Sequence, residues 1–243
     1  MILHKLYNDT EYLYFDEGKH KYYYDDKEVP SVTKITDNLS KPQLPAWAAK
    51  CGAEWFSQNV MPGMKLSTID IDNLIEGIKS AHKNIFEAAG DNGTAVHERI
   101  SRGDFSPSGD AKLDKCVALW QAWLKDHHTV DLFSERLVFS KTHKYAGTLD
   151  KFMMVDTFPE IVDAKTSNGI WPNYDLQVAG YAVALEEEFP GYASMGSRIG
   201  RRIVQINADN DTYKEKIIEP RNFIKDDAAF IALIEIHKWR KKS

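Results

Sequence analysis

The chain has 243 residues, of which 43% are hydrophobic and 28% charged, and its formal net charge is −5. These values are ordinary for a soluble globular protein, and the length allows one large domain or two small ones, with a substantial core. No apolar run is long enough to cross a bilayer, so we expect a cytoplasmic protein with no membrane partner. The acidic balance excludes a general basic field for nucleic acid, although a local groove can still be basic.

The two cysteines, Cys51 and Cys116, lie far apart and form no Cys-x-x-Cys motif. Two cysteines cannot supply the four thiolates of an iron–sulfur cluster, so we expect no such cofactor. We expect both thiols to be reduced and buried in the core.

The N-terminal half is predicted to be a hairpin followed by helices. Aromatic residues on both sides of a polar turn in segment 11–29 predict a hairpin with an aromatic, packed face. Ser31 is placed to cap a short helix that ends near Asn38. Apolar residues at three- and four-residue spacing predict further helices over 45–58, 67–102 and 111–125.

Two features of these helices leave alternatives open. Trp47, Cys51 and Trp55 recur at four-residue spacing, which fits either a buried stripe or a platform for stacking bases. The core is the simpler interpretation. The segment 90–93, Gly-Asp-Asn-Gly, can break or kink the long helix, so we expect either one bent helix or two.

From Leu132 onward the pattern changes to strands. Asn173 is placed to cap a helix that ends near Glu187, and a final helix is predicted over 223–239. The predicted strands cover 132–139, 148–155, 160–164, 198–207 and 213–218.

The strands 148–155 and 160–164 are predicted to form a hairpin with acidic residues opposite each other. If the turn centres near Asp156-Thr157, residues whose numbers add up to about 313 face each other, which sets Asp150 opposite Asp163. Asp163 and Lys165 are two residues apart and leave the same face. Two facing carboxylates repel unless a proton or a cation lies between them, and a hard divalent metal would satisfy both. Asp-x-Lys alone is more often part of a solvated strand face than of a metal site.

Other polar residues accompany this hairpin. His97 lies beside the apolar stripe of the long helix, where it is either a hydrogen-bonded core residue or a ligand. Gln177 and Tyr181 are four residues apart on the next helix and share one face. Glu135, on the strand before the hairpin, is either an accessory acidic residue or a solvent-facing carboxylate.

In chain order these residues resemble the RecB-like branch of the PD-(D/E)XK nuclease superfamily. That branch has a helical histidine, then Gly-x-x-Asp on one strand, Asp/Glu-x-Lys on the next and Gln-x-x-x-Tyr on the following helix. Each motif is weak alone, but four in order are specific. The matching segments are Gly93 to His97, Gly147 to Asp150, Asp163 to Lys165 and Gln177 to Tyr181, while Val29 to Thr33 and Leu44 to Ala48 also look like phage and mitochondrial members.

The resemblance implies an α/β (α+β) fold with a restriction-endonuclease-like central mixed β-sheet flanked by helices and a helical N-terminal region. We expect a single nuclease domain over 1–243, with an N-terminal hairpin and helical region over 1–127 and an α/β catalytic core over 128–243. The chain has no phosphate-binding loop of the helicase type. It is therefore expected to be a stand-alone exonuclease of the phage or mitochondrial type, in the host cytoplasm if phage-encoded.

The resemblance also implies a site for one or two Mg²⁺ or Mn²⁺ ions. Lys165 would orient the attacking water and stabilise developing negative charge beside the metal. The implied catalytic residues are Asp150, Asp163, Lys165, Gln177 and Tyr181. The implied metal ligands are His97, Asp150, Asp163 and the carbonyl of Ala164, with Glu135 as an accessory residue.

The activity implied is hydrolysis of DNA phosphodiester bonds from DNA ends, with a preference for single strands, in recombination, repair or phage DNA processing. Recombination or replication proteins would be its partners. The alternatives are a structure-specific or restriction-like endonuclease and a non-catalytic DNA-binding module that retains the fold. The cations predicted to contact the DNA backbone are Lys141, Lys144, Lys151, Arg198, Arg201, Arg202 and the basic tail at 238–242.

Overall fold

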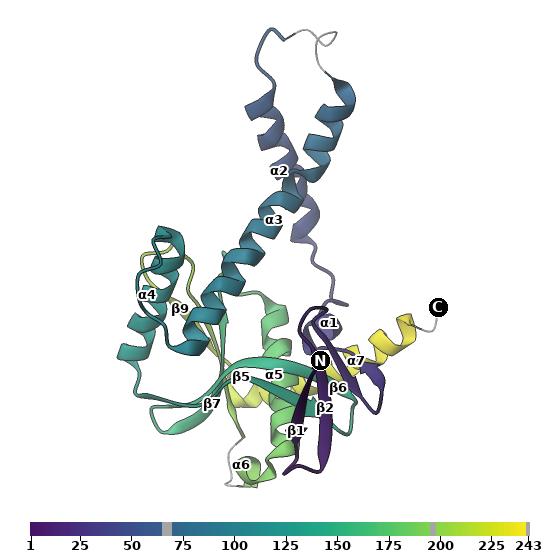
Figure 1. Cartoon of the computed structure of the whole chain (residues 1–243), viewed down its shortest axis with the longest axis vertical. Coiled ribbons are helices and arrows are strands. Elements are labelled where there is room, and N and C mark those ends of the chain that lie inside the picture. Colours follow the sequence, from purple (N-terminus) through teal and green to yellow (C-terminus); the bar gives the residue numbers. More distant parts are fainter. Residues whose placement is uncertain (65–69, 195–197, 242–243) are drawn as a thin grey trace. The chain divides into compact units, whose positions relative to one another are not determined.

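The computed structural model describes residues 1–64, 70–194 and 198–241 (Figure 1). The chain divides into two compact units, one formed by 1–39 together with 96–243 and the other by 40–95. The N-terminal strands therefore belong with the strand-rich C-terminal half, and the units do not divide at the predicted boundary of residue 127. The predicted helix start at Ser67 and Lys242 of the basic tail lie outside the described residues.

The first unit is built on a five-stranded mixed sheet in the order β5-β6-β7-β8-β9. Strands β7 and β8 are parallel and all other neighbours are antiparallel. All five predicted strands are present, and the sheet with its flanking helices confirms a mixed α/β architecture. The strands are β5 (Thr129–Ser140), β6 (Tyr145–Val155), β7 (Phe158–Lys165), β8 (Gly200–Gln205) and β9 (Lys214–Ile217).

The β6–β7 hairpin has the predicted register. Its pairs run from Val155 opposite Phe158 to Lys151 opposite Val162, and each pair adds up to the expected number. The turn is closed at Asp156, which has a positive φ of 55°, a conformation that aspartate tolerates better than most residues. Counted from the turn, the last pair is Lys151 with Val162, and Asp150 is the next residue along β6. The candidate site begins there.

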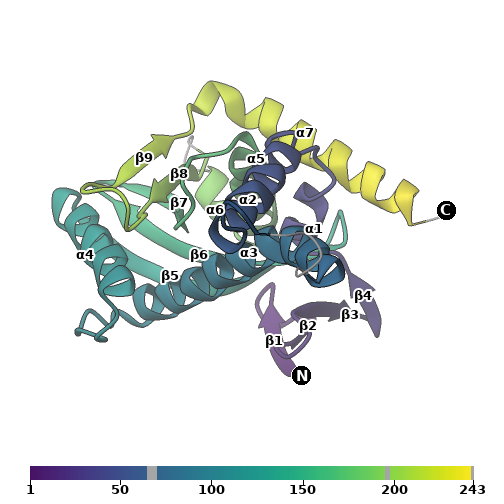
Figure 2. The ribbon, with the colours of Figure 1, turned by 90° about the horizontal axis from the view of Figure 1, so that it is seen from above.

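Helices cover both faces of this sheet (Figure 2). On one face, Phe152 and Ile203 pack with three helices in a single core. On the other face, α4 and the end of α3 pack around Trp120 and Trp123, whose rings stack 4.9 Å apart. The first face carries α1 (Val32–Thr36), α5 (Pro172–Glu188) and α7 (Pro220–Arg240), and the second carries α4 (Ala111–Asp126) and the end of α3 (Ile71–Arg102).

The starts of α1 and α5 test two predicted caps. Ser31 caps α1 as predicted, because its hydroxyl accepts a hydrogen bond from the backbone N–H of Lys34 at 3.0 Å. The predicted cap at Asn173 is wrong, since α5 begins at Pro172 and its N-cap is Trp171. Proline fits the first helical position because the N–H it lacks has no partner there. A short helix, α6 (Pro190–Ser194), follows α5.

The predicted N-terminal hairpin is the centre of a four-stranded antiparallel sheet. Sequence analysis missed its two outer strands, which are short. Leu13 and Tyr22 on the inner face pack against Phe139 of β5, so this small sheet shares a core with the main sheet. The strands are β1 (Ile2–Leu6), β2 (Glu11–Asp16), β3 (Lys21–Tyr24) and β4 (Lys27–Val29).

The second unit contains α2 (Gln43–Asn59) and the first part of α3. A side chain at Gly77 would overlap the ring of Trp55, so the glycine allows the two helices to approach closely. Cys51 is buried on the same stripe, which supports the core interpretation. The segment 90–93 does not break α3, which is one helix of 32 residues. Among the helices described, none has the length and apolar character needed to span a membrane.

Candidate functional site

Three elements meet where β6 and β7 separate. Oδ2 of Asp150, on β6, accepts a hydrogen bond from the backbone N–H of Ala164 at 2.9 Å. Nδ1 of His97, on α3, lies 3.4 Å from the same oxygen. The Asp150 side chain thus accepts a hydrogen bond from β7 and contacts the imidazole of His97 on α3. The order of the motifs along the chain predicts that these residues lie close together.

Asp163 is fully buried on β7. Its Oδ2 forms a close ion pair with the ammonium of Lys165 at 2.5 Å, while its Oδ1 has no hydrogen-bond partner among the described residues. A buried carboxylate oxygen without a hydrogen bond is costly, because it loses its hydration and gains little in return. Its remaining lone pairs suit a bound cation.

Glu135 completes a compact group of donors. One ligand atom from each of His97, Glu135 and Asp150 lies within 4.8 Å of the others. The group does not include Asp163, which was predicted as a ligand. It includes Glu135, for which the sequence indicated only an accessory role. Glu135 has an exposed side chain and a positive φ of 47°, an uncommon conformation for glutamate that is often found at functional sites.

The charges of the site favour an ionised Asp150 and a protonated His97. Burial opposes ionisation of Asp150, but the charges of His97 and Lys165 and the hydrogen bond from Ala164 outweigh it and lower its pKa. The negative charge of Asp150 in turn raises the pKa of His97, against the effect of burial. A metal bound through His97 would have to displace this proton.

The pKa values of the other two carboxyl groups, Asp163 and Glu135, are shifted in the opposite direction. Burial, together with the charge of Asp150, raises the pKa of Asp163 to about 6. Desolvation of the Glu135 carboxyl and the charge of Asp150 raise the pKa of Glu135 to about 7. Burial lowers the pKa of Lys165, but the charges of Asp163 and Asp150 overcome that effect and raise it. Carboxylates this crowded, with an imidazole, form a donor set that fits Mn²⁺ or Mg²⁺.

Tyr174 is a neighbour of Lys165 that sequence analysis missed. The ammonium lies 5.1 Å from the centre of the Tyr174 ring, and the tyrosine hydroxyl donates a hydrogen bond to Oγ of Ser167 at 3.1 Å. The available signal was its position three residues before Gln177, which places both on one helical face.

Gln177 and Tyr181 share a face of α5 as predicted, and Nε2 of Gln177 donates to the Tyr181 hydroxyl at 3.0 Å. The Tyr181 ring lies against Gly147 on β6, where a Cβ atom would come within 2.7 Å of it. This contact gives a physical reason for glycine three residues before Asp150. Tyr181 therefore packs α5 against β6, and Gln177 binds the Tyr181 hydroxyl.

Three cations predicted to contact DNA are buried instead. Lys151 pairs with Asp131 at 2.6 Å, and Arg201 pairs with Asp227 at 2.8 Å. Arg202 binds two carboxylates from neighbouring strands. Only 1–5% of the surface of Arg201 and Arg202 is exposed, so the structure contradicts their prediction as phosphate contacts, and that of Lys151 with them. Sequence alone does not reveal such tertiary ion pairs.

Other predicted cations of this set are more exposed but engaged. Arg198 forms ion pairs with Glu186 and Asp227. Lys141 forms an ion pair with Glu11, and Lys144 lies 4.4 Å from the centre of the Tyr24 ring. Both contacts join the small sheet to the β5–β6 turn. Neither contact excludes a role at DNA, which stays a prediction.

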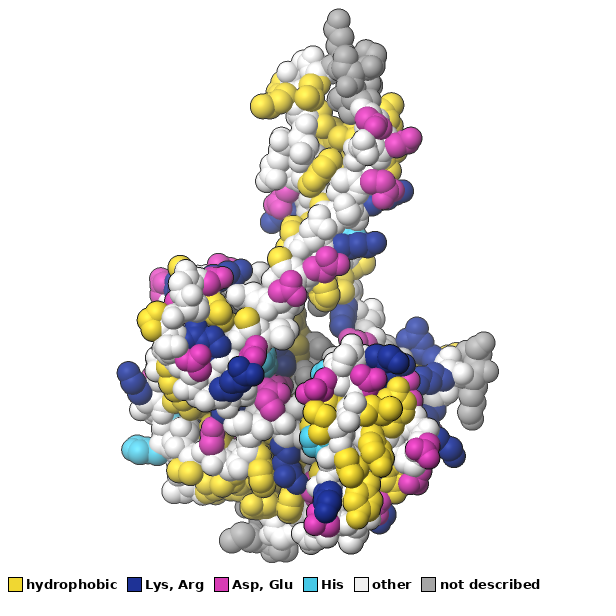
Figure 3. Space-filling view, viewed as in Figure 1, with side chains coloured by type: hydrophobic (Ala, Val, Ile, Leu, Met, Phe, Trp, Pro, Cys, Tyr) yellow, Lys and Arg dark blue, Asp and Glu magenta, His cyan; other side chains and the backbone are white. Residues whose placement is uncertain are grey.

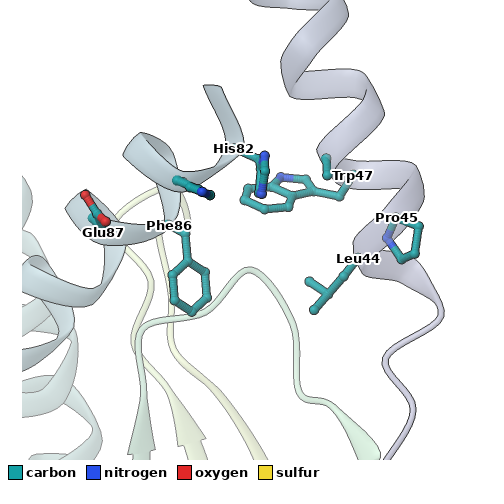
Figure 4. A pocket seen from close by; sticks show the side chains of 8 residues that line it. Leu44, Pro45, Trp47, His82, Phe86 and Glu87 are labelled. Carbon is teal, nitrogen blue, oxygen red and sulfur yellow. The ribbon is translucent and has the colours of Figure 1, made fainter. Parts of the chain in front are cut away.

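The second unit contains a separate cavity of about 420 Å³ (Figure 4). Trp47 and His82 meet edge to face across it, with ring centres 6.3 Å apart. Leu44 and Phe86 add exposed apolar surface. This cavity contains none of the predicted catalytic or ligand residues.

Comparison with protein-family models finds no match, and a search of curated proteins finds no match either. Function must therefore be argued from the residues themselves.

Proposed function

We propose that this chain is a divalent-metal-dependent deoxyribonuclease of the RecB-like PD-(D/E)XK type. The observation that supports it most is Asp163, a fully buried carboxylate that is paired with Lys165 and whose Oδ1 has no hydrogen-bond partner among the described residues. A carboxylate kept for structure is expected to be hydrogen-bonded, as Glu160 is on the same strand. The motif order along the chain provides separate support.

His97, Glu135, Asp150 and Asp163 would hold one or two Mg²⁺ or Mn²⁺ ions. The bound ion would polarise the scissile phosphate and lower the pKa of the attacking water. The raised pKa of Lys165 keeps it protonated, so it would act as a cation and hydrogen-bond donor to the phosphate or the water, not as a base.

The proposed reaction is exonucleolytic, from DNA ends with a preference for single strands, in recombination, repair or phage DNA processing. These finer points rest on the resemblance. End-labelled single- and double-stranded DNA, incubated with Mg²⁺, Mn²⁺ or a chelator, tests activity and metal dependence together. Circular single-stranded DNA distinguishes an exonuclease from an endonuclease. An endonuclease can cleave it, whereas an exonuclease has no end at which to begin.

Two variants make this test specific. Asp163→Asn removes the buried charge, and Asp211→Asn removes an almost fully exposed acid as a matched control. We expect nucleotide release to be lost in the first and retained in the second. Full activity in Asp163→Asn would overturn the proposal. Calorimetry that shows no Mn²⁺ binding by the native chain would favour the non-catalytic module.

A further inference from the structure

The small N-terminal sheet reaches the candidate site through one tyrosine. Hydrophobic side chains gather over β1 and β2 on the exposed face of this sheet (Figure 3). Tyr22 on β3 lies on the opposite face, where it packs in one core with Leu137 of β5, and only 1% of its surface is exposed. Its hydroxyl lies 2.9 Å from Oγ1 of Thr148 on β6. A buried polar group thus connects the small sheet to the strand that carries Asp150.

Thr148 lies beside the group of donor residues, on the same face of the main sheet. It is two residues before Asp150 on β6, so the two side chains leave one face. The register of β5 with β6 on both sides of Glu135 sets that residue opposite Asp150. Glu135 and Thr148 are therefore diagonal neighbours across the two strands, a separation of roughly 7–8 Å that a long side chain can span.

The two hydroxyl groups leave one proton available to the site. Among the described residues, Thr148 is the hydrogen-bond partner of the buried Tyr22 hydroxyl and no other residue bonds to it. If Tyr22 accepted from Thr148, its own proton would be buried without a partner, which is costly. Tyr22 is therefore the donor. Thr148 then keeps a proton that none of the described residues accepts.

Glu135 is the carboxylate of the group that lacks a donor. Asp150 accepts a hydrogen bond from the backbone of Ala164, whereas Glu135 accepts none from any residue that the structure describes. Its side chain is exposed, so more than one rotamer is open to it. Carboxylates that bind metals are generally held in orientation by a hydrogen bond from a neighbouring residue. Thr148 is placed to supply that bond.

The charges around Tyr22 agree with this arrangement. Burial raises the pKa of Tyr22 and so does the negative charge of Glu135, against the effect of the hydrogen bond with Thr148. The phenol therefore stays protonated at neutral pH and remains a donor. Glu135 also lies close enough to act on it.

We propose that Tyr22 and Thr148 are positioning residues of the metal site. Tyr22 donates to Thr148, and Thr148 donates to one oxygen of the Glu135 carboxylate, which leaves the other oxygen for the ion. This inference rests on the proposed nuclease function, in which Glu135 is a metal ligand. It makes the small N-terminal sheet a part of the metal site.

The test is calorimetry of Mn²⁺ binding without DNA, because it measures metal affinity independently of activity. Tyr22→Phe removes only the hydroxyl. Tyr24→Phe is the matched control, since the Tyr24 hydroxyl on the same strand donates to Glu11. We expect Tyr22→Phe to raise the dissociation constant for Mn²⁺ about tenfold, within the loss expected when a ligand loses the residue that orients it. Tyr24→Phe should bind Mn²⁺ as the native chain does.

Variants of Thr148 separate the hydroxyl from packing. Thr148→Val keeps the shape and should weaken Mn²⁺ binding about tenfold, whereas Thr148→Ser keeps the hydroxyl and should bind normally. Tyr22→Phe should add nothing to Thr148→Val, because Tyr22 acts through Thr148. It should also have no effect in Glu135→Ala, which lacks the carboxylate that the pair orients. The thermal midpoint without metal shows that each variant is folded.

Three results would overturn the inference. The first is equal Mn²⁺ affinity of Tyr22→Phe and Tyr24→Phe. The second is a loss in Thr148→Ser as large as that in Thr148→Val, which would indicate packing. The third is an effect of Tyr22→Phe that persists in Glu135→Ala, which would mean that the pair does not act through Glu135.

The native chain separates the two proposals. Metal-dependent DNA hydrolysis together with Mn²⁺ binding that is independent of Tyr22 would support the nuclease and reject the positioning role. Mn²⁺ binding that depends on Tyr22 and Thr148, without hydrolysis, would do the reverse. A native chain that neither binds Mn²⁺ nor cleaves DNA would reject both.

Discussion

Two buried charge clusters lie along strand β7, and they differ in one respect. In the first, Arg202 donates to both oxygens of Glu160, at 2.8 and 3.1 Å, and to Glu215 at 2.8 Å. In the second, three residues along β7, Asp163 pairs with Lys165, but its Oδ1 has no hydrogen-bond partner among the described residues. The first cluster is satisfied within the chain and the second is not.

This difference is the one expected between a structural cluster and the proposed metal site. A fully bonded ion pair offsets much of its own desolvation and needs no ligand. A buried carboxylate with free lone pairs is stabilised further when a cation binds it. Arg201 and Asp227 also have atoms without a hydrogen-bond partner, so what distinguishes Asp163 is the group of donor residues His97, Glu135 and Asp150 beside it.

The largest expected effect is on catalysis. Asp163→Asn should lower the rate of Mg²⁺-dependent DNA hydrolysis by roughly 10³-fold, equivalent to about 4 kcal/mol, because the site loses a charged ligand. The thermal midpoint without metal should fall less than that of Glu160→Gln, since the variant costs Lys165 its ion pair but also removes the repulsion between Asp163 and Asp150. The two measurements together are decisive, because a larger fall than that of Glu160→Gln would mean that Asp163 is structural.

Glu160→Gln should give the opposite result. Breaking the buried pair leaves Arg202 with fewer partners, so we expect the free energy of unfolding to fall by roughly 3 kcal/mol, as measured by urea denaturation. Hydrolysis at a temperature where the variant is folded should change less than threefold. A large loss of activity with unchanged stability would erase the distinction between the two clusters.

The architecture of this region could be predicted because its signals are local. Alternating apolar residues indicated β5 to β9, and the turn at Asp156 fixed the β6–β7 register. Short elements carried too little pattern, so β1 and β4 were missed. The cap at Asn173 failed because the proline beside it decided where α5 begins.

The candidate site could be predicted only in part, for a related reason. Asp150, Asp163 and Lys165 followed from register and strand alternation. The direction of Glu135 depends on a positive φ near an irregular pairing of β5 with β6, which the sequence does not show. Tyr174 meets Lys165, and Arg201 meets Asp227, only through tertiary packing.

The third prediction concerns pH and metal. The folded-state pKa of Asp163 is raised from 3.8 to about 6 and that of Glu135 from 4.5 to about 7. Groups with raised pKa values contribute stability that is fully present below pH 4 and lost as pH rises through 6 and 7. A divalent cation would relieve this loss, because it binds the ionised forms.

The increase in thermal midpoint caused by Mn²⁺ should therefore be larger at pH 8 than at pH 5, by about 3 °C for each 1 kcal/mol recovered. Scanning calorimetry of the native chain and of Asp163→Asn measures it. Glu160→Gln should retain the pH dependence, because its cluster needs no metal. An equal Mn²⁺ effect at both pH values would contradict the metal assignment.

The smallest expected effect concerns the aromatic ring beside each cation. Arg202 lies 5.9 Å from the centre of the Trp123 ring, as Lys165 lies 5.1 Å from that of Tyr174. Arg202 is already held by two carboxylates, so the Trp123 ring adds little to its positioning. Lys165 pairs with Asp163 alone, so the Tyr174 ring is the main additional contact that holds the ammonium in place.

Tyr174→Leu should therefore reduce kcat by about fivefold, or ~1 kcal/mol, in the range of a partly desolvated cation–π contact. KM should stay the same, because a positioning effect on Lys165 acts in the transition state. Tyr174→Phe keeps the ring and loses only the hydrogen bond to Ser167, so it should retain nearly full activity. If Tyr174→Phe were as slow as Tyr174→Leu, the hydroxyl rather than the ring would be the positioning element, and the two clusters would not share this feature.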